Sequence, residues 1–152
     1  MNLIVFVCTG NTCRSPMAKI IAENMIHSVA FESAGIFAKE NGSMAKYSRE
    51  ALEQDNFLIG DFQSKRLHLD LIHQADLVLT MTTEQKDIIR SFFEDDSGKV
   101  YTLKEYTGSS EISADIQDPF GKNRQVYFET AAEIKKEIEK LSNILVKNYG
   151  IE

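Results

Sequence analysis

The beginning of the chain constrains the fold most strongly, because an apolar strand runs directly into a loop and a helix start. Residues 2–7 read Asn-Leu-Ile-Val-Phe-Val, a short β-branched run suited to a strand covered on both faces. Ser15 is a favourable helix N-cap, and Pro16 fits the first helical turn, where a missing N–H is tolerated. Between the predicted strand and Ser15 lies the loop Cys-Thr-Gly-Asn-Thr-Cys-Arg at 8–14. This strand–loop–helix unit is typical of an α/β domain.

The rest of the chain repeats the alternation of strand-like runs and amphipathic stretches. Further strands are predicted at 29–33, 75–81 and 99–103, with a turn at Ser33-Ala34-Gly35. Helices are predicted at 43–54, at 67–73 and after the capping-box pair Thr82 and Gln85. A last helix carries an apolar stripe, namely Tyr127, Ala131, Ile134, Ile138, Leu141 and Leu145. Such alternation predicts a parallel sheet with helices on both faces, an α/β fold of three layers.

One segment departs from the alternation. Residues 104–124 have no clear periodicity and contain Asp118-Pro119-Phe120. A connection of this length inside a compact domain is usually functional or disordered. Asp before Pro is also a common way to begin a turn, so the segment alone does not assign a role to Asp118.

Size and charge exclude several classes of protein. A chain of 152 residues fits a single domain, taken here as 1–152. The net charge of −6 and the pI near 5.1 argue against a nucleic-acid-binding surface. The apolar run at 3–7 is far too short to cross a membrane, and the first residues lack a signal-peptide pattern. We therefore expect a cytoplasmic protein that binds neither nucleic acid nor membrane.

The cysteine and histidine pattern predicts neither a metal site nor another cofactor. Cys8 and Cys13 are the two cysteines, and their spacing with no further ligand set does not match a zinc site. The three histidines, His27, His68 and His73, are scattered, and each is expected to be an ordinary polar residue.

The first loop has the composition of an anion site with a nucleophile. Backbone N–H groups and the helix dipole attract an anion where a strand passes through a glycine-containing turn into a helix. The same helix start and the Arg14 guanidinium both favour the thiolate form of Cys8. Arg14 can hold two oxygens of a phosphoryl group, and Asn11 tolerates a left-handed backbone. Ser15 either caps the helix or donates its hydroxyl to Cys8. A cysteine and an arginine separated by five residues are common by chance, and buried cysteines are mostly inert, but here the pair coincides with the strand end and helix start.

The run Val-Cys-Thr-Gly-Asn-Thr-Cys-Arg-Ser-Pro-Met-Ala at 7–18 resembles the signature of the low-molecular-weight protein tyrosine phosphatase family. Ser33-Ala34-Gly35, residues 75–81 and Asp118-Pro119-Phe120-Gly121 extend the resemblance over nearly the whole chain. The resemblance implies a flavodoxin-like, four-stranded parallel sheet. It also implies Cys8 as the nucleophile that forms a phosphocysteine and Asp118 as the general acid. It further implies that Arg14 binds the phosphate. The substrate-binding residues that it implies are Thr9, Gly10, Asn11, Thr12, Cys13, Ser15 and Phe120. Phosphorylated proteins are the expected partners of a monomeric enzyme.

Thr12 bears on which phosphorylated residue is the substrate. Relatives that act on phosphotyrosine usually carry an aliphatic residue there, whereas the run Thr-Gly-Asn-Thr-Cys at 9–13 resembles the bacterial branch that acts on protein phosphoarginine. A hydroxyl can hydrogen-bond the polar guanidine, directly or through a water, where an aliphatic wall suits a phenyl ring. Phe120 would stack on either group. We therefore predict a protein-arginine phosphatase, with a tyrosine phosphatase as the alternative if Thr12 is a neutral substitution.

Three further alternatives concern the same residues. An arsenate reductase would need additional thiols, and no cysteine follows Cys13. A non-catalytic phosphoprotein-binding module would be expected to lose Cys8 or Asp118, and both are present. Cys13 either forms a protective disulfide with Cys8 on oxidation or simply packs the loop.

Overall fold

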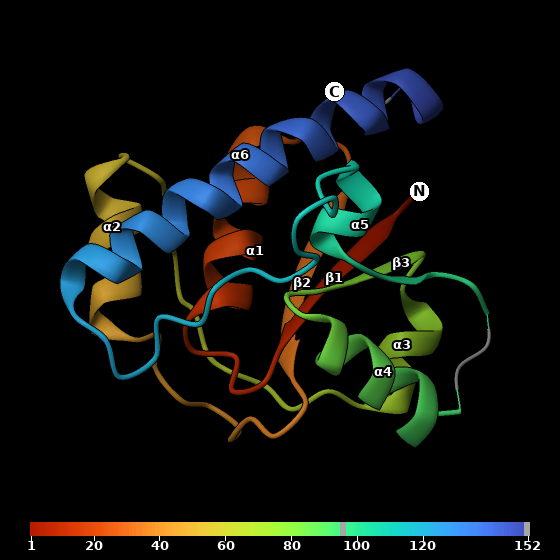
Figure 1. Ribbon diagram of the computed structural model, residues 1–152, viewed down its shortest axis with the longest axis horizontal. Coiled ribbons are helices and arrows are strands. Elements are labelled where there is room, and N and C mark those ends of the chain that lie inside the picture. Colours follow the sequence, from red (N-terminus) through yellow and green to blue (C-terminus); the bar gives the residue numbers. More distant parts are fainter. Residues whose placement is uncertain (95–96, 151–152) are drawn as a thin grey trace.

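The computed structural model describes residues 1–94 and 97–150, and within these ranges a four-stranded parallel sheet lies between two layers of helices (Figure 1). The elements follow one another as β1 Leu3–Cys8, α1 Arg14–Met25, β2 Ala30–Gly35, α2 Lys46–Gln54, α3 Leu69–Gln74, β3 Leu77–Thr80, α4 Thr83–Phe92, β4 Val100–Thr102, α5 Leu103–Thr107 and α6 Arg124–Tyr149. The predicted α/β architecture of three layers is confirmed.

The strand order places the end of β1 at a natural ligand site. The sheet runs β2-β1-β3-β4, so the chain first adds a strand on one side of β1 and then continues on the other side. All pairs are parallel, with Cys8 opposite Gly35 on β2 and Val7 opposite Thr80 on β3. In such sheets ligands bind beyond the carboxyl ends of the strands at the point where the order reverses. Cys8 ends β1 at this point.

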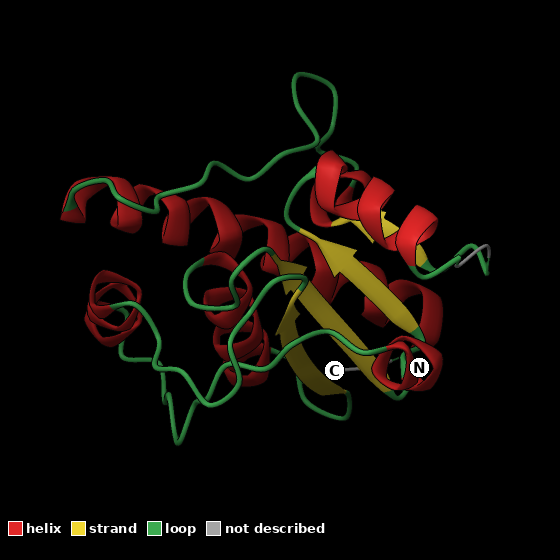
Figure 2. Ribbon diagram, turned by 90° about the horizontal axis from the view of Figure 1, so that it is seen from below, coloured by secondary structure: helices red, strands yellow, loops and turns green. Residues whose placement is uncertain are grey.

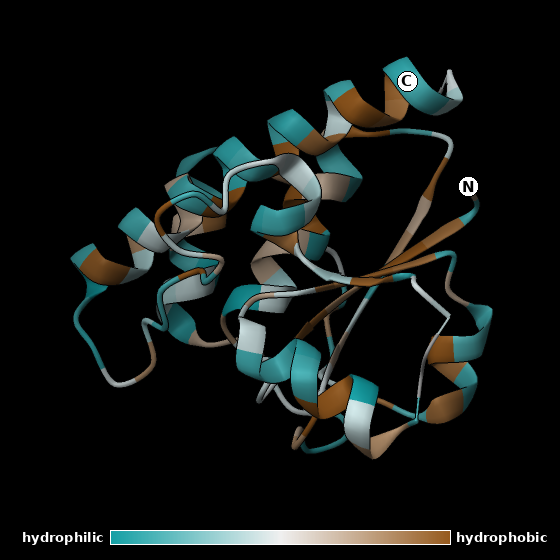
Figure 3. Ribbon diagram, turned by 45° about the vertical axis from the view of Figure 1, so that its right-hand side comes forward, coloured by the Kyte–Doolittle hydropathy of each residue, from teal (hydrophilic) through white to brown (hydrophobic). Residues whose placement is uncertain are grey.

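Alternate residues of β1 belong to two separate cores. Ile4, Phe6 and Cys8 join the cluster that contains residues of α1 and α6, while Val5 and Val7 join the cluster with residues of α3 and α4. Figure 2 shows helices on both faces of the twisted sheet, and Figure 3 shows the hydrophobic strands at its centre. The period of two along a strand therefore directs Cys8 toward the α1 side of the sheet.

The long C-terminal helix packs as its sequence pattern predicts. Every residue of the predicted apolar stripe is buried in α6, which lies across α1 and α2 in Figure 1. Asn123 caps its first turn by accepting a hydrogen bond from the Val126 N–H. The capping box at the start of α4 is also confirmed, because the Thr82 and Gln85 side chains satisfy each other's backbone N–H groups.

Two predictions beside the first loop are wrong. Helix α1 begins at Arg14 with Cys13 as its N-cap, not with Ser15, because the Ser15 hydroxyl contacts Cys8 and Asn11 instead. The predicted turn at 33–35 is the end of strand β2, because these small residues fit against β1. Other element boundaries differ from the predicted ones by only a few residues.

Helix α5 was not predicted. It lies at the beginning of the segment 104–124, which was expected to be irregular throughout. A second capping box opens it, formed by Thr102 and Glu105, and Gly108 ends it in the left-handed conformation with φ of 79°. The spacing of Thr102 and Glu105 was the available signal, because it matches the capping-box pattern.

Gly35 is expected to be essential for the shape of the adjacent loop. A Cβ at this position would lie 2.7 Å from the Thr9 carbonyl oxygen and 2.8 Å from the Asn11 backbone nitrogen. We predict that Gly35→Ala lowers the free energy of unfolding by about 1–3 kcal/mol and also reduces the phosphate ester hydrolysis that the family resemblance leads us to expect, because neighbouring backbone must shift. Urea unfolding and turnover of an aryl phosphate measure the two effects.

Gly60→Ala is the matched control. Gly60 has φ of 69°, and among the described residues no atom lies within 4 Å of the Cβ it would gain. This variant should lose stability through backbone strain of about 1 kcal/mol while turnover stays at the wild-type level. Wild-type stability and turnover in Gly35→Ala would contradict the prediction.

Candidate active site

A small cavity opens at the carboxyl end of β1. Its volume is about 220 Å³, and it is lined by Cys8, Thr9, Gly10, Thr12, Cys13, Arg14, Asp118 and Phe120. The fold thus brings the Cys8 loop (residues 8–15) together with the Asp118 segment (residues 115–120), which lies more than a hundred positions further along the chain. Of the predicted site residues, Asn11 and Ser15 do not line the cavity, and both lie behind Cys8.

Two polar groups contact the Cys8 sulfur. The Ser15 Oγ lies 2.8 Å from the Cys8 Sγ, and the Asn11 backbone N–H donates to the same sulfur over 3.2 Å. Ser15 is completely buried and Cys8 is 3% exposed. Both contacts fix the position of the sulfur at the wall of the cavity. Of the two roles considered for Ser15, the structure supports the hydroxyl contact with Cys8.

Asn11 holds the Cys8 loop in its curled shape. Its φ of 54° is left-handed, as the sequence predicted. Its side-chain Nδ2 donates to Ser15 Oγ and to Ser33 Oγ, each over 2.9 Å, and its Oδ1 accepts from the Lys65 N–H over 2.9 Å. Ser33 and Lys65 were not predicted as supporting residues, because their contacts with Asn11 join segments far apart in sequence.

Arg14 connects the Cys8 loop to the Asp118 segment. Its side chain is 6% exposed, its Nη1 donates to the Ile116 carbonyl over 3.0 Å, and its Nη2 lies 3.6 Å from Asp118 Oδ2. The Asp118 side chain is 57% exposed, and its Oδ1 accepts from the Phe120 N–H over 3.0 Å. A guanidinium, a thiol and a carboxylate therefore face one cavity that is large enough for a phosphoryl group.

Gln85 is a supporting residue whose contact with the site was not predicted. Its Oε1 accepts from the N–H groups of Met81 and Thr82, and its Nε2 donates to Thr9 Oγ1 over 3.2 Å. The same buried amide thus caps α4 and fixes the Cys8 loop. The sequence pattern revealed the cap, but it carried no signal for the partner in the loop.

Cys13 has different surroundings from Cys8. Its Sγ lies 3.5 Å from Tyr127 Oη and 3.7 Å from Thr12 Oγ1. Burial raises the pKa of the Cys13 thiol, an effect that the bonds to Tyr127 and Thr12 partly offset. Burial and the contact with Cys13 together raise the pKa of Tyr127 well above its ordinary value. Both groups are therefore neutral at neutral pH, and Cys13 is a thiol.

Neither a metal site nor a membrane span is present in the described part of the chain. Within residues 1–94 and 97–150, His, Cys, Asp and Glu side chains nowhere form a group of three that could hold a metal ion. The helices in these ranges also include none that is long and apolar enough to span a membrane.

A thiol, a guanidinium and a carboxylate that line one cavity are the groups that a cysteine-dependent phosphatase requires. Comparison with known proteins gives the family. The model of the family described as low molecular weight phosphotyrosine protein phosphatase matches residues 3–150. The chain belongs to this family.

Individual relatives cover almost the entire chain. A protein from Bacillus subtilis (strain 168) named protein-arginine-phosphatase is 42% identical over 149 residues, which are 95% of this chain and 97% of the relative. A low molecular weight protein-tyrosine-phosphatase of Staphylococcus epidermidis is 38% identical over 138 residues, which are 91% of this chain and 95% of the relative. A solved YwlE arginine phosphatase has a TM-score of 0.90 and 38% identity over 99% of both chains.

The raised pKa of Cys13 predicts how its alkylation depends on pH. In a Cys8→Ser variant Cys13 is the remaining thiol. The midpoint of its pH–rate curve with iodoacetamide should lie above the ordinary pKa of 9.0. Mass spectrometry of labelling time courses between about pH 7 and about pH 11 measures this curve. The same variant unfolded in guanidinium is the control, and a folded protein whose midpoint lies at or below that of the unfolded control would contradict the prediction.

Proposed function

We propose that this chain hydrolyses phosphoarginine in proteins through a phosphocysteine intermediate. The observation that carries the substrate assignment is the position of Thr12 on the wall of the reaction cavity, together with Asp118 and the guanidinium of Arg14. Thr12 is half-buried, so its hydroxyl is available to a group that enters beside Cys8.

In the first step the Cys8 thiolate attacks phosphorus and the bond from phosphorus to the arginine nitrogen breaks. Arg14 and the backbone N–H groups of the Cys8 loop hold the phosphoryl oxygens as charge redistributes. Asp118 gives its proton to the departing guanidine nitrogen, which leaves as part of a neutral or protonated arginine. A positioned acid of this kind contributes about 10²–10⁴-fold to the rate.

In the second step water attacks the phosphocysteine, and the bond between sulfur and phosphorus breaks to release inorganic phosphate. Asp118, now a carboxylate, accepts the proton of the attacking water. The departing thiolate of Cys8 is stabilised by the Ser15 hydroxyl and the Asn11 N–H, which lie 2.8 Å and 3.2 Å from its sulfur. The cycle ends with the thiolate and the protonated acid that began it.

The comparisons support both parts of this proposal. The relative from Bacillus subtilis that shares 42% of the aligned residues is named a protein-arginine-phosphatase. The solved arginine phosphatase with a TM-score of 0.90 is a variant in which serine replaces the active-site cysteine and carries phosphate. A phosphorylated residue at the equivalent position is what a phosphocysteine pathway predicts for Cys8.

The side chains around the cavity favour a polar substrate over an aromatic one. The Thr12 hydroxyl and the carbonyl oxygen of the protonated Asp118 carboxyl group both offer acceptors to the N–H groups of a guanidine. A phenyl ring has no hydrogen-bond donor, so these acceptors would lose their hydrogen bonds to water without gaining a new partner. Phe120 is 74% exposed and offers a flat surface that suits a guanidinium and a phenol equally.

A tyrosine phosphatase is the second candidate, because relatives that share 38% and 35% of the aligned residues are named protein-tyrosine-phosphatases. Under either assignment the enzyme acts on phosphorylated protein substrates.

We further propose that it acts as a monomer in the cytoplasm, where reducing conditions keep a catalytic thiol active.

Replacement of Thr12 tests the substrate assignment. We predict that wild type has a higher kcat/KM on a phosphoarginine peptide than on the matched phosphotyrosine peptide. Thr12→Ile should shift that ratio toward phosphotyrosine by about 10–100-fold, because the hydroxyl is lost and an aliphatic wall is gained. Steady-state phosphate release measures both constants.

Thr12→Ser is the matched control, since it keeps the hydroxyl and removes one methyl group. It should retain the preference for phosphoarginine. A wild-type preference for phosphotyrosine would contradict the substrate assignment, and an unchanged ratio in Thr12→Ile would contradict the role of the hydroxyl.

A further inference from the structure

Four successive residues fix the Asp118 segment, and each of them contacts a different part of the fold. The Asp115 carboxylate accepts from the Thr83 N–H at the start of α4 over 2.8 Å. Ile116 is 1% exposed in the core, and its N–H donates to the carbonyl at Met81, just after β3, over 2.8 Å. Asp118 faces Arg14 of α1, as described above. The remaining residue, Gln117, is held by α6.

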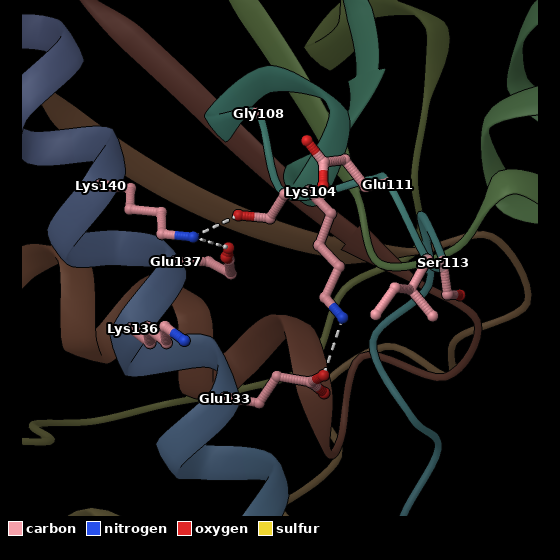
Figure 4. Close-up of a pocket in the computed structure, with 10 residues that line it drawn as sticks. Lys104, Gly108, Glu111, Ser113, Glu133, Lys136, Glu137 and Lys140 are labelled. Carbon is pink, nitrogen blue, oxygen red and sulfur yellow. Dashed lines mark hydrogen bonds and ion pairs between the residues drawn. The ribbon is translucent and has the colours of Figure 1, made fainter.

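Glu133 is the residue of α6 that holds Gln117. Its Oε1 accepts from the Gln117 N–H over 3.4 Å, while its Oε2 pairs with Lys104 Nζ of α5 over 2.8 Å. Figure 4 shows the Lys104 side chain extended across a cavity toward Glu133, with the ion pair drawn between them. The Lys104 side chain is 16% exposed and that of Glu133 is 30% exposed, so the pair is partly shielded from water.

The same face of α6 also fixes the beginning of the long connection. Lys140 Nζ donates to Ser109 Oγ over 2.6 Å, and Glu137 Oε1 accepts from Thr107 Oγ1 over 3.4 Å. Glu133, Glu137 and Lys140 are spaced at i, i+4 and i+7, which places them on one side of the helix. Figure 4 shows them lined along α6 facing α5. This polar row holds the connection at both of its ends.

The Asp118 side chain has two restraints. Its Oδ2 forms a long ion pair with Arg14 at 3.6 Å, and its Oδ1 accepts from the Phe120 N–H of the same segment over 3.0 Å, while more than half of the side chain is exposed. Because the shorter contact is made within its own segment, the position of the carboxylate depends on the backbone on both sides of it, and Gln117 is the adjacent residue before it. A displacement of about 1 Å at a catalytic group can cost on the order of 100-fold in rate.

We propose that Glu133, oriented by Lys104, is a positioning residue for Asp118 and sets the efficiency of proton donation to the leaving group. This inference rests on the proposed role of Asp118 as general acid, and it does not depend on which phosphorylated amino acid is the substrate. Loss of the carboxylate leaves the Gln117 N–H without this acceptor and Lys104 without its partner.

The experiment compares two aryl phosphates that differ in their need for an acid. Phenyl phosphate has a poor leaving group that needs a proton, whereas 2,4-dinitrophenyl phosphate has a leaving group that departs as an anion. We expect Glu133→Ala to lower kcat/KM on phenyl phosphate by about 10-fold and to leave kcat/KM on 2,4-dinitrophenyl phosphate nearly unchanged. The comparison uses kcat/KM because this constant reports phosphoryl transfer to Cys8, before the step in which Asp118 is proposed to act as a base for either substrate.

Two further variants separate positioning from a general loss of structure. Glu133→Gln keeps one oxygen acceptor, which can still serve the Gln117 N–H, but it loses the charge that pairs with Lys104, so it should recover part of the phenyl phosphate activity lost in Glu133→Ala. Glu139→Ala removes an exposed glutamate of the same helix and should match wild type on both substrates. Equal losses on both substrates in Glu133→Ala, or wild-type activity on both, would overturn the proposal.

A double-mutant cycle tests whether Glu133 acts through Asp118. In an Asp118→Asn background, Glu133→Ala should have no further effect on phenyl phosphate, because the group that it positions is gone. An additive loss would overturn the proposal. If Asp118→Asn alone left phenyl phosphate turnover unchanged, the acid role would be wrong and this inference would fail with it. The preference for phosphoarginine over phosphotyrosine is measured in the separate peptide experiment on Thr12. A wrong substrate assignment can therefore be told apart from a wrong role for Glu133.

Discussion

Arg14 is buried with its guanidinium between the Cys8 loop and the Asp118 segment, and the geometry of the site depends on this position. A buried guanidinium needs partners, because an unpaired charge in the interior is very costly. Here the Ile116 carbonyl accepts one N–H over 3.0 Å, and Asp118 lies 3.6 Å from another nitrogen. The requirement to satisfy one buried charge therefore joins two segments that are distant in sequence, and both segments line the same cavity.

The Cys8 loop is organised before any substrate arrives. Asn11 adopts the left-handed backbone that the tight loop needs, and its amide fixes Ser15, which in turn contacts Cys8. Gly35 permits β2 to lie directly against this loop. Because these groups are already in place, the proposed mechanism needs little reorganisation when negative charge moves onto the phosphoryl oxygens or back to the sulfur.

The sequence predicted features that depend on neighbouring residues and missed those that depend on tertiary contacts. The strand, loop and helix at the start, the capping box at Thr82 and the stripe on α6 follow local rules, and the structure confirms them. Ser15 was expected to be either a cap or a partner of Cys8, and only the fold could decide. The roles of Gln85 and Glu133 arise because α4 and α6 pass beside loops far away in the chain. Helix α5 was missed although a capping-box pattern marked its beginning.

Direct detection of the covalent intermediate tests the central claim, that Cys8 is the nucleophile of a phosphatase. 2,4-Dinitrophenyl phosphate, whose leaving group needs no acid, is mixed with the Asp118→Asn variant, which lacks the base proposed for hydrolysis of the intermediate, and the reaction is quenched in acid within milliseconds. Peptide mapping by mass spectrometry should find one phosphoryl group on Cys8. The Cys8→Ser, Asp118→Asn double variant is the control, and it should show no phosphorylated residue that forms and is then hydrolysed. Phosphate on another residue, or turnover by wild type with no phosphorylated Cys8 at any quench time, would contradict the account.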